Sequence, residues 1–312
     1  MKISAVISTW NKKDDVLANL EALKMGSRVP DEIVVVDNAS TDGTVEAIES
    51  EHPDVVLVTM PHDRCGACET FNIGFKRATG DCIAIMDDDV VATPEWLETL
   101  EACLDQEPTW TGMVSSRVVE PGMPAEYEAA EIAQGPYYAA TFRGCGTLAR
   151  ADVLRACGGY DERFFIYGNE RDLAARVLNR GWRILQTPDA VIHHATPFGM
   201  KAGARSLYYH VRNYWMYAFK YLPFLDILKV TFLLTRRATG GSGDAVRPDA
   251  TASATEIELE ATGTMGFSQL VRQTPGSLWI ILKATLAAFI QLPYCLSRRD
   301  PVDSPDFRPP GV

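Results

Sequence analysis

The sequence predicts an α/β protein whose sheet is doubly wound and mostly parallel, with a helical extension at its C-terminal end. Short apolar runs alternate with helical patterns in residues 3–86, which is the arrangement of βαβ units. Polar residues follow directly on several of these runs. Beyond residue 205 the alternation stops, and two longer apolar stretches take its place.

Four apolar runs predict buried strands, because only a strand covered on both faces needs apolar side chains throughout. They span residues 3–9, 32–37, 55–58 and 82–86. Apolar residues at helical spacing, or a Thr79-Gly80 turn that ends a helix, predict helices between the strands. These helices are expected over residues 16–23, 44–49 and 67–78.

The chain after residue 95 is less regular, above all from 105 to 135. The expected elements are helices over 95–104, 152–157 and 169–180 and strands over 113–119, 182–186 and 190–193. The last two strands flank a turn at Thr187-Pro188-Asp189. Gly144-Cys145-Gly146 predicts a place where the backbone approaches a ligand closely, because glycine leaves room there.

The composition is that of a globular protein, with 312 residues of which 46% are hydrophobic and 23% charged. A formal net charge of −11 argues against a nucleic-acid partner. Residues 201–312 hold 13 Lys and Arg against 9 Asp and Glu, whereas residues 1–200 hold 17 against 32. The acidic residues 1–200 and the more basic residues 201–312 are therefore expected to contact different partners. Seven scattered cysteines indicate a reducing, cytoplasmic compartment rather than a disulfide framework.

Three polar clusters follow the predicted parallel strands at their carboxyl ends, where such sheets bind ligands. They are Thr9 with Asn11, residues 37–40, and the adjacent aspartates 87–89. Three neighbouring carboxylates repel one another, and Mg²⁺ or Mn²⁺ would relieve that repulsion. The alternative is the acidic start of a helix, since Thr93-Pro94-Glu95 forms a good N-terminal cap. No G-x-G-x-x-G or G-x-x-x-x-G-K-[ST] motif supports a Rossmann or P-loop site.

Two further groups of residues could carry chemistry. Glu170 and Asp172 stand at the start of a predicted helix, where one of them could act as a general base. Alternatively, Asn169 caps that helix and the acids are favoured by its dipole. His193-His194 ends a predicted strand and is either packed or a metal ligand.

Several of these segments are motifs that occur together. In chain order they are Val6-Ile7-Ser8-Thr9-Trp10-Asn11, Val36-Asp37-Asn38-Ala39-Ser40-Thr41-Asp42-Gly43-Thr44, Asn72-Ile73-Gly74 with Gly80, Met86-Asp87-Asp88-Asp89, Gly159-Tyr160-Asp161-Glu162, Asn169-Glu170-Arg171-Asp172-Leu173, Pro188-Asp189-Ala190-Val191-Ile192-His193 and Arg212-Asn213. Over residues 3–215 the chain thus resembles family 2 glycosyltransferases of the GT-A fold, particularly the rhamnosyltransferase-like members.

This resemblance implies a nucleotide-diphosphate sugar donor and roles for individual residues. The donor site would comprise Thr9, Asn11, Asp37, Asn38, Ser40, Arg64, Asn72, Asp87 and Asp88. Asp37 would recognise the nucleobase, and Asp87 and Asp88 would lie at the ribose and sugar. Asp89 would hold a divalent cation, Mg²⁺ or Mn²⁺, with Asp87 and His193 as further ligands. The family's Glu-Asp-x-Asp motif reads Asn169-Glu170-Arg171-Asp172 here, so its catalytic carboxylates would be Glu170, as the base, and Asp172.

The implied reaction is a direct displacement with inversion, which moves the sugar to a hydroxyl acceptor. Such transfers build cell-surface polysaccharides, glycolipids or glycoprotein glycans. One alternative is a sugar-1-phosphate nucleotidyltransferase, although Ser8-Thr9-Trp10-Asn11 stands where its glycine-rich loop is expected. Another is a non-catalytic scaffold that binds sugar nucleotides, which the Asn169-Glu170 departure from the motif would suit.

The residues after the catalytic part predict contact with a membrane surface. We expect a catalytic domain over 1–205, an apolar and aromatic helical segment over 206–235, a flexible linker over 236–276, an apolar helix over 277–299 and a disordered tail over 300–312. Aromatic residues mixed with basic ones favour helices that lie on the membrane rather than span it. Lys283 and Pro293 also interrupt the second apolar stretch. A lipid-linked glycan as acceptor, and a peripheral place on the cytoplasmic face of the membrane, would explain these features. Packing of both helices on the catalytic domain and a true membrane span are the alternatives.

Overall fold

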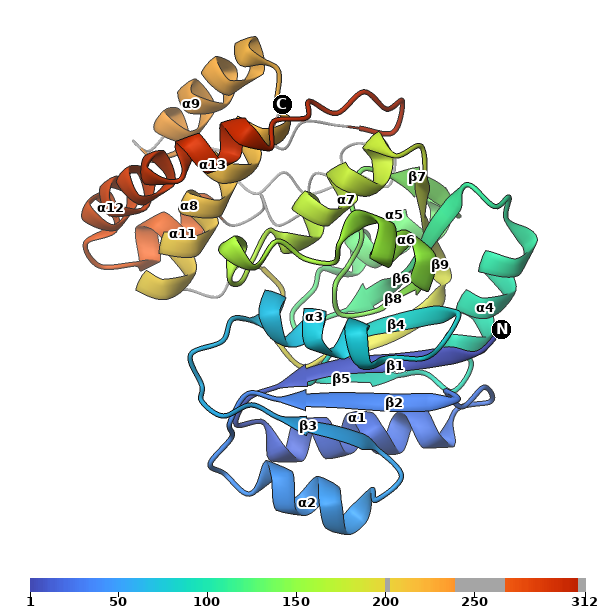
Figure 1. Ribbon diagram of the computed structural model, residues 1–312. Coiled ribbons are helices and arrows are strands. Elements are labelled where there is room, and N and C mark those ends of the chain that lie inside the picture. The colour runs from blue at the N-terminus through green and yellow to red at the C-terminus, as the bar shows by residue number, and fades with distance from the viewer. Residues whose placement is uncertain (200–202, 239–266, 308–312) are drawn as a thin grey trace.

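The computed structural model describes residues 1–199, 203–238 and 267–307 (Figure 1). Its central sheet has the strand order β3-β2-β1-β4-β8-β6-β9-β5, with β7 paired to β9. The strands are β1 Ile3–Thr9, β2 Glu32–Asp37, β3 Val56–Thr59, β4 Cys82–Asp87, β5 Val90–Ala92, β6 Thr111–Val119, β7 Tyr137–Ala139, β8 Thr147–Arg150 and β9 Arg183–His194. The helices packed around it are α1 Lys13–Met25, α2 Thr44–Glu51, α3 Ala67–Arg77, α4 Trp96–Gln106, α5 Ala125–Gln134, α6 Ala151–Cys157, the 3₁₀ turn η1 Glu162–Phe164 and α7 Asn169–Asn179.

The first four strands form the parallel half of the sheet, as the sequence predicts. β1 lies between β2 and β4 and runs parallel to both. In this register Thr9 is opposite Asp37, and Ser8 is opposite Asp87. The polar residues at the carboxyl ends of these strands therefore meet on one rim of the sheet.

The second half of the sheet is mixed, so the expectation of a mostly parallel sheet is too simple. β8 runs antiparallel to β4 and β6, and β9 runs antiparallel to β5 and β7. Residues 183–194 form the single strand β9 instead of two strands around a turn. The predicted turn is replaced by a register shift against β6, because Ser116 pairs with Thr187 and Arg117 with Val191, so that residues 188–190 are passed over. A helix, α5, occupies part of the region expected to be irregular.

Successive residues of the central strands point to opposite faces, as a strand requires. Val6 lies in a core that also contains Phe71 of α3 and Leu173 of α7. Ile7 lies in a second core with Leu20 of α1 and Trp96 of α4. Helices thus cover both faces of the sheet (Figure 1), which explains why its central strands are apolar throughout.

The C-terminal extension consists of α8 Ala204–Tyr221, α9 Phe224–Ala238, α11 Phe267–Gln273, α12 Ser277–Ile290 and α13 Leu292–Ser297. α8 packs against the catalytic core through Met216 and against α12 through a small cluster that includes Leu207 and Ala284. Across the described residues, no helix combines the length and the apolar character needed to cross a bilayer.

Residues 300–307 correct one expectation of disorder. The Asp300 amide donates to the Lys220 carbonyl at 2.8 Å, Asp306 forms an ion pair with Arg183, and Phe307 packs on the catalytic core. These contacts hold the tail against the domain. The remainder of the tail, 308–312, and residues 239–266 of the expected linker lie outside the described residues, while the linker's ends belong to α9 and α11.

Candidate active site

The carboxyl rim of β1 and β2 carries three buried polar side chains with unused hydrogen-bonding atoms. Asp37 is fully buried, and its Oδ2 accepts a hydrogen bond from the Ser40 amide at 2.9 Å. Within the described part of the chain, Asp37 Oδ1, Thr9 Oγ1 and Asn38 Oδ1 have no partner. Buried polar atoms are normally hydrogen-bonded. These three atoms are therefore suited to a polar ligand at this rim.

Asn11 and Ser40 use their polar groups to join the loops after β1 and β2. The Asn11 amide donates to Ser40 Oγ at 2.8 Å, and Asn11 Oδ1 accepts from the Thr41 amide at 2.8 Å. Asn11 and Ala39 both adopt left-handed backbone conformations, with φ of 51° and 57°. These contacts shape the walls of the rim, and a direct contact of either side chain with a donor stays a prediction.

Three residues that could bind a metal ion lie close together at the end of β4. One ligand atom each from Asp87, Asp89 and His194 lies within 4.8 Å of the others. The prediction that His193 is a metal ligand is wrong, because the neighbouring His194 lies in this group instead. Adjacent residues of a strand face opposite ways, and in β9 it is His194 that faces the aspartates while His193 is exposed.

Glu120, which was not among the predicted site residues, orients the histidine. His194 Nε2 lies 3.1 Å from Asp89 Oδ1, and Nδ1 lies 2.9 Å from Glu120 Oε1. A metal-binding histidine usually donates its second ring N–H to a carboxylate in this way. Two carboxylates and an imidazole so oriented are a donor set that fits Mn²⁺ or Mg²⁺.

The charges in this cluster are strongly coupled. Burial, together with the charges of its neighbours, raises the pKa of Asp87 to about 6, and burial likewise raises that of Asp88 to about 7. Burial would also raise the pKa of Asp89, but hydrogen bonds from His194 and Lys12 hold it well below its usual range. Lys12 Nζ lies 3.1 Å from Asp89 Oδ2. Cationic groups already offset the charge of Asp89, and a divalent cation would do the same for the whole cluster.

The pKa of His194 is shifted in the opposite direction to that of Asp89. Burial would lower its pKa, but hydrogen bonds to Asp89 and Glu120 raise it to about 10. The imidazole is therefore protonated at neutral pH. A cation that binds Nε2 must displace the proton there.

Glu170 stands at the N-terminal end of α7, beside Gly144. Burial raises the pKa of its carboxyl, and Oε1 accepts a hydrogen bond from Asn169 Nδ2 at 3.0 Å. A Cβ added to Gly144 would lie 2.6 Å from Glu170 Oε1. Gly144 therefore makes room for this carboxyl, whereas a Cβ added to Gly146 would meet Ser116 and Ile192. A close approach of this backbone to a ligand stays a prediction. The cap of α7 is Gly168, at φ 72°, and not Asn169.

The loop before α7 is held in a strained conformation. Phe165 and Tyr167 have φ of 68° and 66°, values that bulky residues rarely adopt. Asn213 of α8 stabilises the loop, since its Nδ2 donates to the carbonyls of Phe164, Ile166 and Tyr167 at 2.7–2.9 Å. The Arg212-Asn213 motif thus supports the segment that leads into Glu170.

Two predicted site residues, Asn72 and Asp172, do not join this rim in the way expected. Asn72 bonds the Tyr160 backbone with both ends of its amide, at 2.9 and 2.7 Å, so it fastens α3 to the loop after α6. Asp172 is fully buried, and both its oxygens are occupied by Arg176, Lys220 and Tyr221. Neither side chain is available to a substrate. Arg64 is exposed, and its contact with a donor stays a prediction.

The sheet order and the acidic rim define the class of protein, which is that of the GT-A fold. The sequence model of the glycosyl transferase family 2 matches residues 4–166, which is more than half of the chain. The chain belongs to glycosyl transferase family 2.

Curated relatives cover parts of the chain. An uncharacterized glycosyltransferase of Haemophilus influenzae is 29% identical over 106 residues, or 34% of this chain and 35% of that protein. The pre-mycofactocin glycosyltransferase of Mycobacterium tuberculosis is 29% identical over 183 residues, or 52% and 37%. N-acetylglucosaminyl-diphospho-decaprenol L-rhamnosyltransferase of the same species is 25% identical over 224 residues, or 56% and 70%. The chain thus spans about a third of the first two relatives.

Solved structures share the fold over nearly the whole chain. S. aureus TarS in complex with UDP-GlcNAc has a TM-score of 0.59 at 17% identity, and the match covers 96% of this chain and 84% of that one. Mannosyltransferase PcManGT from Pyrobaculum calidifontis, in complex with GDP-Man and Mn²⁺, has a TM-score of 0.55 at 19% identity, with 94% and 87% covered. At these identities the likeness shows the fold alone.

Proposed function

We propose that this protein is an inverting, metal-dependent glycosyltransferase that moves a hexosyl or rhamnosyl group from a nucleoside-diphosphate sugar to a hydroxyl acceptor. The observation that carries the proposal is the cluster of Asp87, Asp89 and His194 on the same rim as the unpartnered atoms of Thr9, Asp37 and Asn38. The first group suits a cation that binds a diphosphate, and the second suits a nucleoside.

Glu170 is the proposed general base. Its charge contributes to the raised pKa of Asp87, which supports assigning the two carboxyls to one site. Glu170 would take the proton of the acceptor hydroxyl as that oxygen bonds to the anomeric carbon and the bond from carbon to the diphosphate oxygen breaks. When bound at Asp87, Asp89 and His194, a divalent cation would supply charge that stabilises the departing diphosphate. Asp88 would lie beside the donor sugar and ribose.

Donor binding should be measurable as stabilisation of the fold. A ligand present at about 100 times its Kd stabilises the native state by about 2.7 kcal/mol, so we expect Tm to rise by several degrees. The measurement is a thermal-shift screen of UDP, GDP and dTDP sugars with and without Mn²⁺. Stabilisation by one nucleotide class that requires Mn²⁺ supports the proposal, whereas no shift with any of them would count against it.

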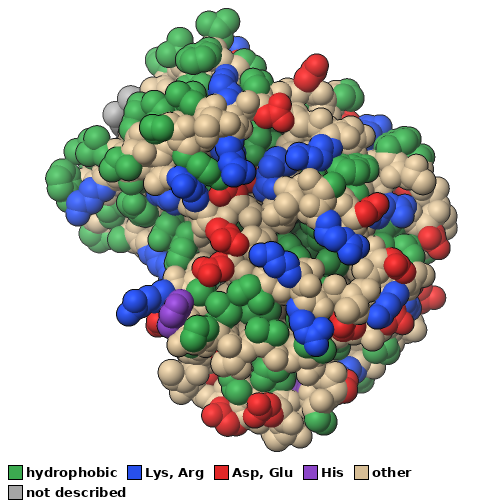
Figure 2. All heavy atoms as spheres, viewed as in Figure 1, with side chains coloured by type: hydrophobic (Ala, Val, Ile, Leu, Met, Phe, Trp, Pro, Cys, Tyr) green, Lys and Arg blue, Asp and Glu red, His purple; other side chains and the backbone are tan. Residues whose placement is uncertain are grey.

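The C-terminal helices carry the apolar surface through which we propose that the protein lies on the cytoplasmic face of a membrane. Most of the large hydrophobic side chains exposed in the described residues are there: Phe224, Leu225, Leu228, Phe232, Leu278, Trp279, Leu282, Leu286, Phe289, Ile290 and Leu296. Figure 2 shows hydrophobic side chains gathered over these helices with basic residues among them. Arg272 of α11, Lys283 of α12 and Arg298, which directly follows α13, are exposed as well, and such a pattern favours an anionic bilayer.

This surface also fits the kind of acceptor that a membrane would present, such as a lipid-linked glycan. A relative's name contains a decaprenol-linked acceptor, which is in keeping with that class. Transfer would then serve the assembly of cell-surface polysaccharide, glycolipid or glycoprotein glycans.

Vesicle flotation tests the membrane surface. The double variant Leu282→Asp and Leu286→Asp places charges on the exposed stripe of α12, and we expect binding to anionic vesicles to fall about tenfold or more. Ile132→Asp is the matched control, because Ile132 is 52% exposed but lies on α5. A wild-type protein that does not float with anionic vesicles would contradict the proposal.

A further inference from the structure

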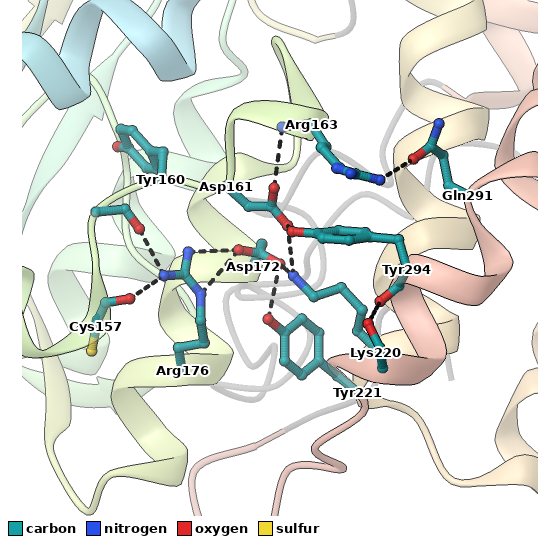
Figure 3. Close-up of polar contacts among 12 residues, drawn as sticks. Cys157, Tyr160, Asp161, Arg163, Asp172, Arg176, Lys220, Tyr221, Gln291 and Tyr294 are labelled. Carbon is teal, nitrogen blue, oxygen red and sulfur yellow. Dashed lines mark hydrogen bonds and ion pairs between the residues drawn. The ribbon is translucent and has the colours of Figure 1, made fainter.

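A buried group of charges joins α7 to the C-terminal helices (Figure 3). Lys220 of α8 is 2% exposed and forms ion pairs with Asp172 and Asp161. Arg176 of α7 pairs with Asp172 at 2.6 Å. Two cations and two carboxylates therefore balance each other inside the protein, where an unpaired charge would be unfavourable.

Two tyrosines complete this network from different helices. Tyr221 Oη of α8 donates to Asp172 Oδ1 at 2.9 Å, and Tyr294 Oη of α13 donates to Asp161 Oδ2 at 2.8 Å. The guanidinium of Arg163 lies 3.8 Å from the centre of the Tyr294 ring and bonds Gln291 at 2.9 Å. Gln291 and Tyr294, which follow the exposed hydrophobic residues of α12, are thus connected to the residues that hold α7 in place.

The position of Asp172 determines what this connection does. Asp172 follows Glu170 by two residues in α7, and successive residues of an α-helix are about 100° apart around its axis. The two side chains therefore leave the helix on nearly opposite sides. Fixing Asp172 on the buried side sets the rotation of α7 and so the direction in which Glu170 points.

We propose that Lys220, Tyr221 and Tyr294 are positioning residues, which hold α7 so that Glu170 faces the rim. The proposal rests on the function proposed above for Glu170. Its consequence is that the C-terminal helices act on the chemistry as well as on localisation. Loss of a contact in this network loosens α7 and misaligns Glu170, while the donor rim on β1, β2 and β4 stays formed.

The test compares Tyr294→Phe and Lys220→Met in the full-length chain. Tyr294→Phe removes one hydrogen bond and keeps the ring, so it should fold, and we expect kcat to fall about tenfold with an unchanged KM for the donor. Lys220→Met should have the larger effect. Hydrogen exchange of the amides across α7 should become faster in both variants.

Asp306→Asn is the control, because it breaks the ion pair of Asp306 with Arg183, which ties the C-terminal chain to the domain without a bond to Asp172 or Glu170. The same chain also bonds Asn179, the last residue of α7, through Asp300 and Asp303. Asp306→Asn should lower Tm yet leave kcat, and exchange over the first two turns of α7, as in the wild type. Unchanged exchange across α7 in Tyr294→Phe and Lys220→Met would overturn the proposal. A wild type without transfer activity would refute the proposed function instead, and exchange across α7 would still decide the positioning role.

Discussion

Replacing Glu170 by Gln is expected to lower kcat by about 10²–10⁴-fold, which is the usual contribution of a general base. The amide has nearly the same shape and cannot take the acceptor's proton. Binding of the nucleotide with Mn²⁺ should stay as in the wild type, because Glu170 is not in the cluster that includes Asp87 and Asp89. Steady-state kinetics and donor titration measure the two effects separately. Unchanged turnover in Glu170→Gln would assign the base to another group.

The same variant has a predictable effect on stability. Burial raises the pKa of Glu170 in the folded state, so the folded protein binds the proton more tightly than the unfolded chain does. The contribution of this group to stability is then fully present below the unfolded pKa and is lost as pH rises through the folded pKa. Gln is neutral at every pH. We therefore expect Glu170→Gln to have a higher Tm than the wild type at neutral pH and a similar Tm in acid, by calorimetry.

Replacing Asp89 by Ala is expected to reduce both turnover and metal-dependent nucleotide binding, the latter by at least about tenfold. The change removes a carboxylate that also pairs with Lys12 and His194. Nucleotide binding without metal should change little, since Asp37 and Asn38 are intact. Raising the Mn²⁺ concentration should restore part of the activity in Asp89→Ala and none in Glu170→Gln.

The prediction for Asp89→Ala has a control in another carboxylate of the same protein. Asp105→Ala removes an exposed carboxylate at the far end of α4 and should leave metal-dependent binding as in the wild type. If Asp89→Ala bound the nucleotide with the same dependence on Mn²⁺ as Asp105→Ala, the cluster would not be the metal site.

The parallel half of the sheet and its acidic rim could be predicted because their signals are local. Apolar runs such as 82–86 need cover on both faces, and the polar residues after them must lie on one rim. The mixed half was harder to predict, because β8 and β9 obtain their partners from distant strands. Helix α5 was missed because its buried face combines Tyr127 with the charged Glu131, while the apolar Ile132 is exposed.

The roles of single polar residues depend on partners that local sequence does not reveal. Asn72 bonds Tyr160, and Asp172 bonds Lys220, so both motif residues proved to be internal contacts. Alternation along β9 shows that His193 and His194 face opposite ways but not which one faces the rim. Glu120 directly follows β6, as the acidic cluster follows β4, and that similarity was the available signal.

Counting the Mn²⁺ bound per chain in the presence of the nucleoside diphosphate tests the proposed site most directly. Bound ions are measured by the loss of the free-ion signal in electron paramagnetic resonance. We predict about one bound ion in the wild type and in Glu170→Gln, and none at the same concentration in Asp89→Ala. Equal binding by the wild type and Asp89→Ala would contradict a metal site at Asp87, Asp89 and His194.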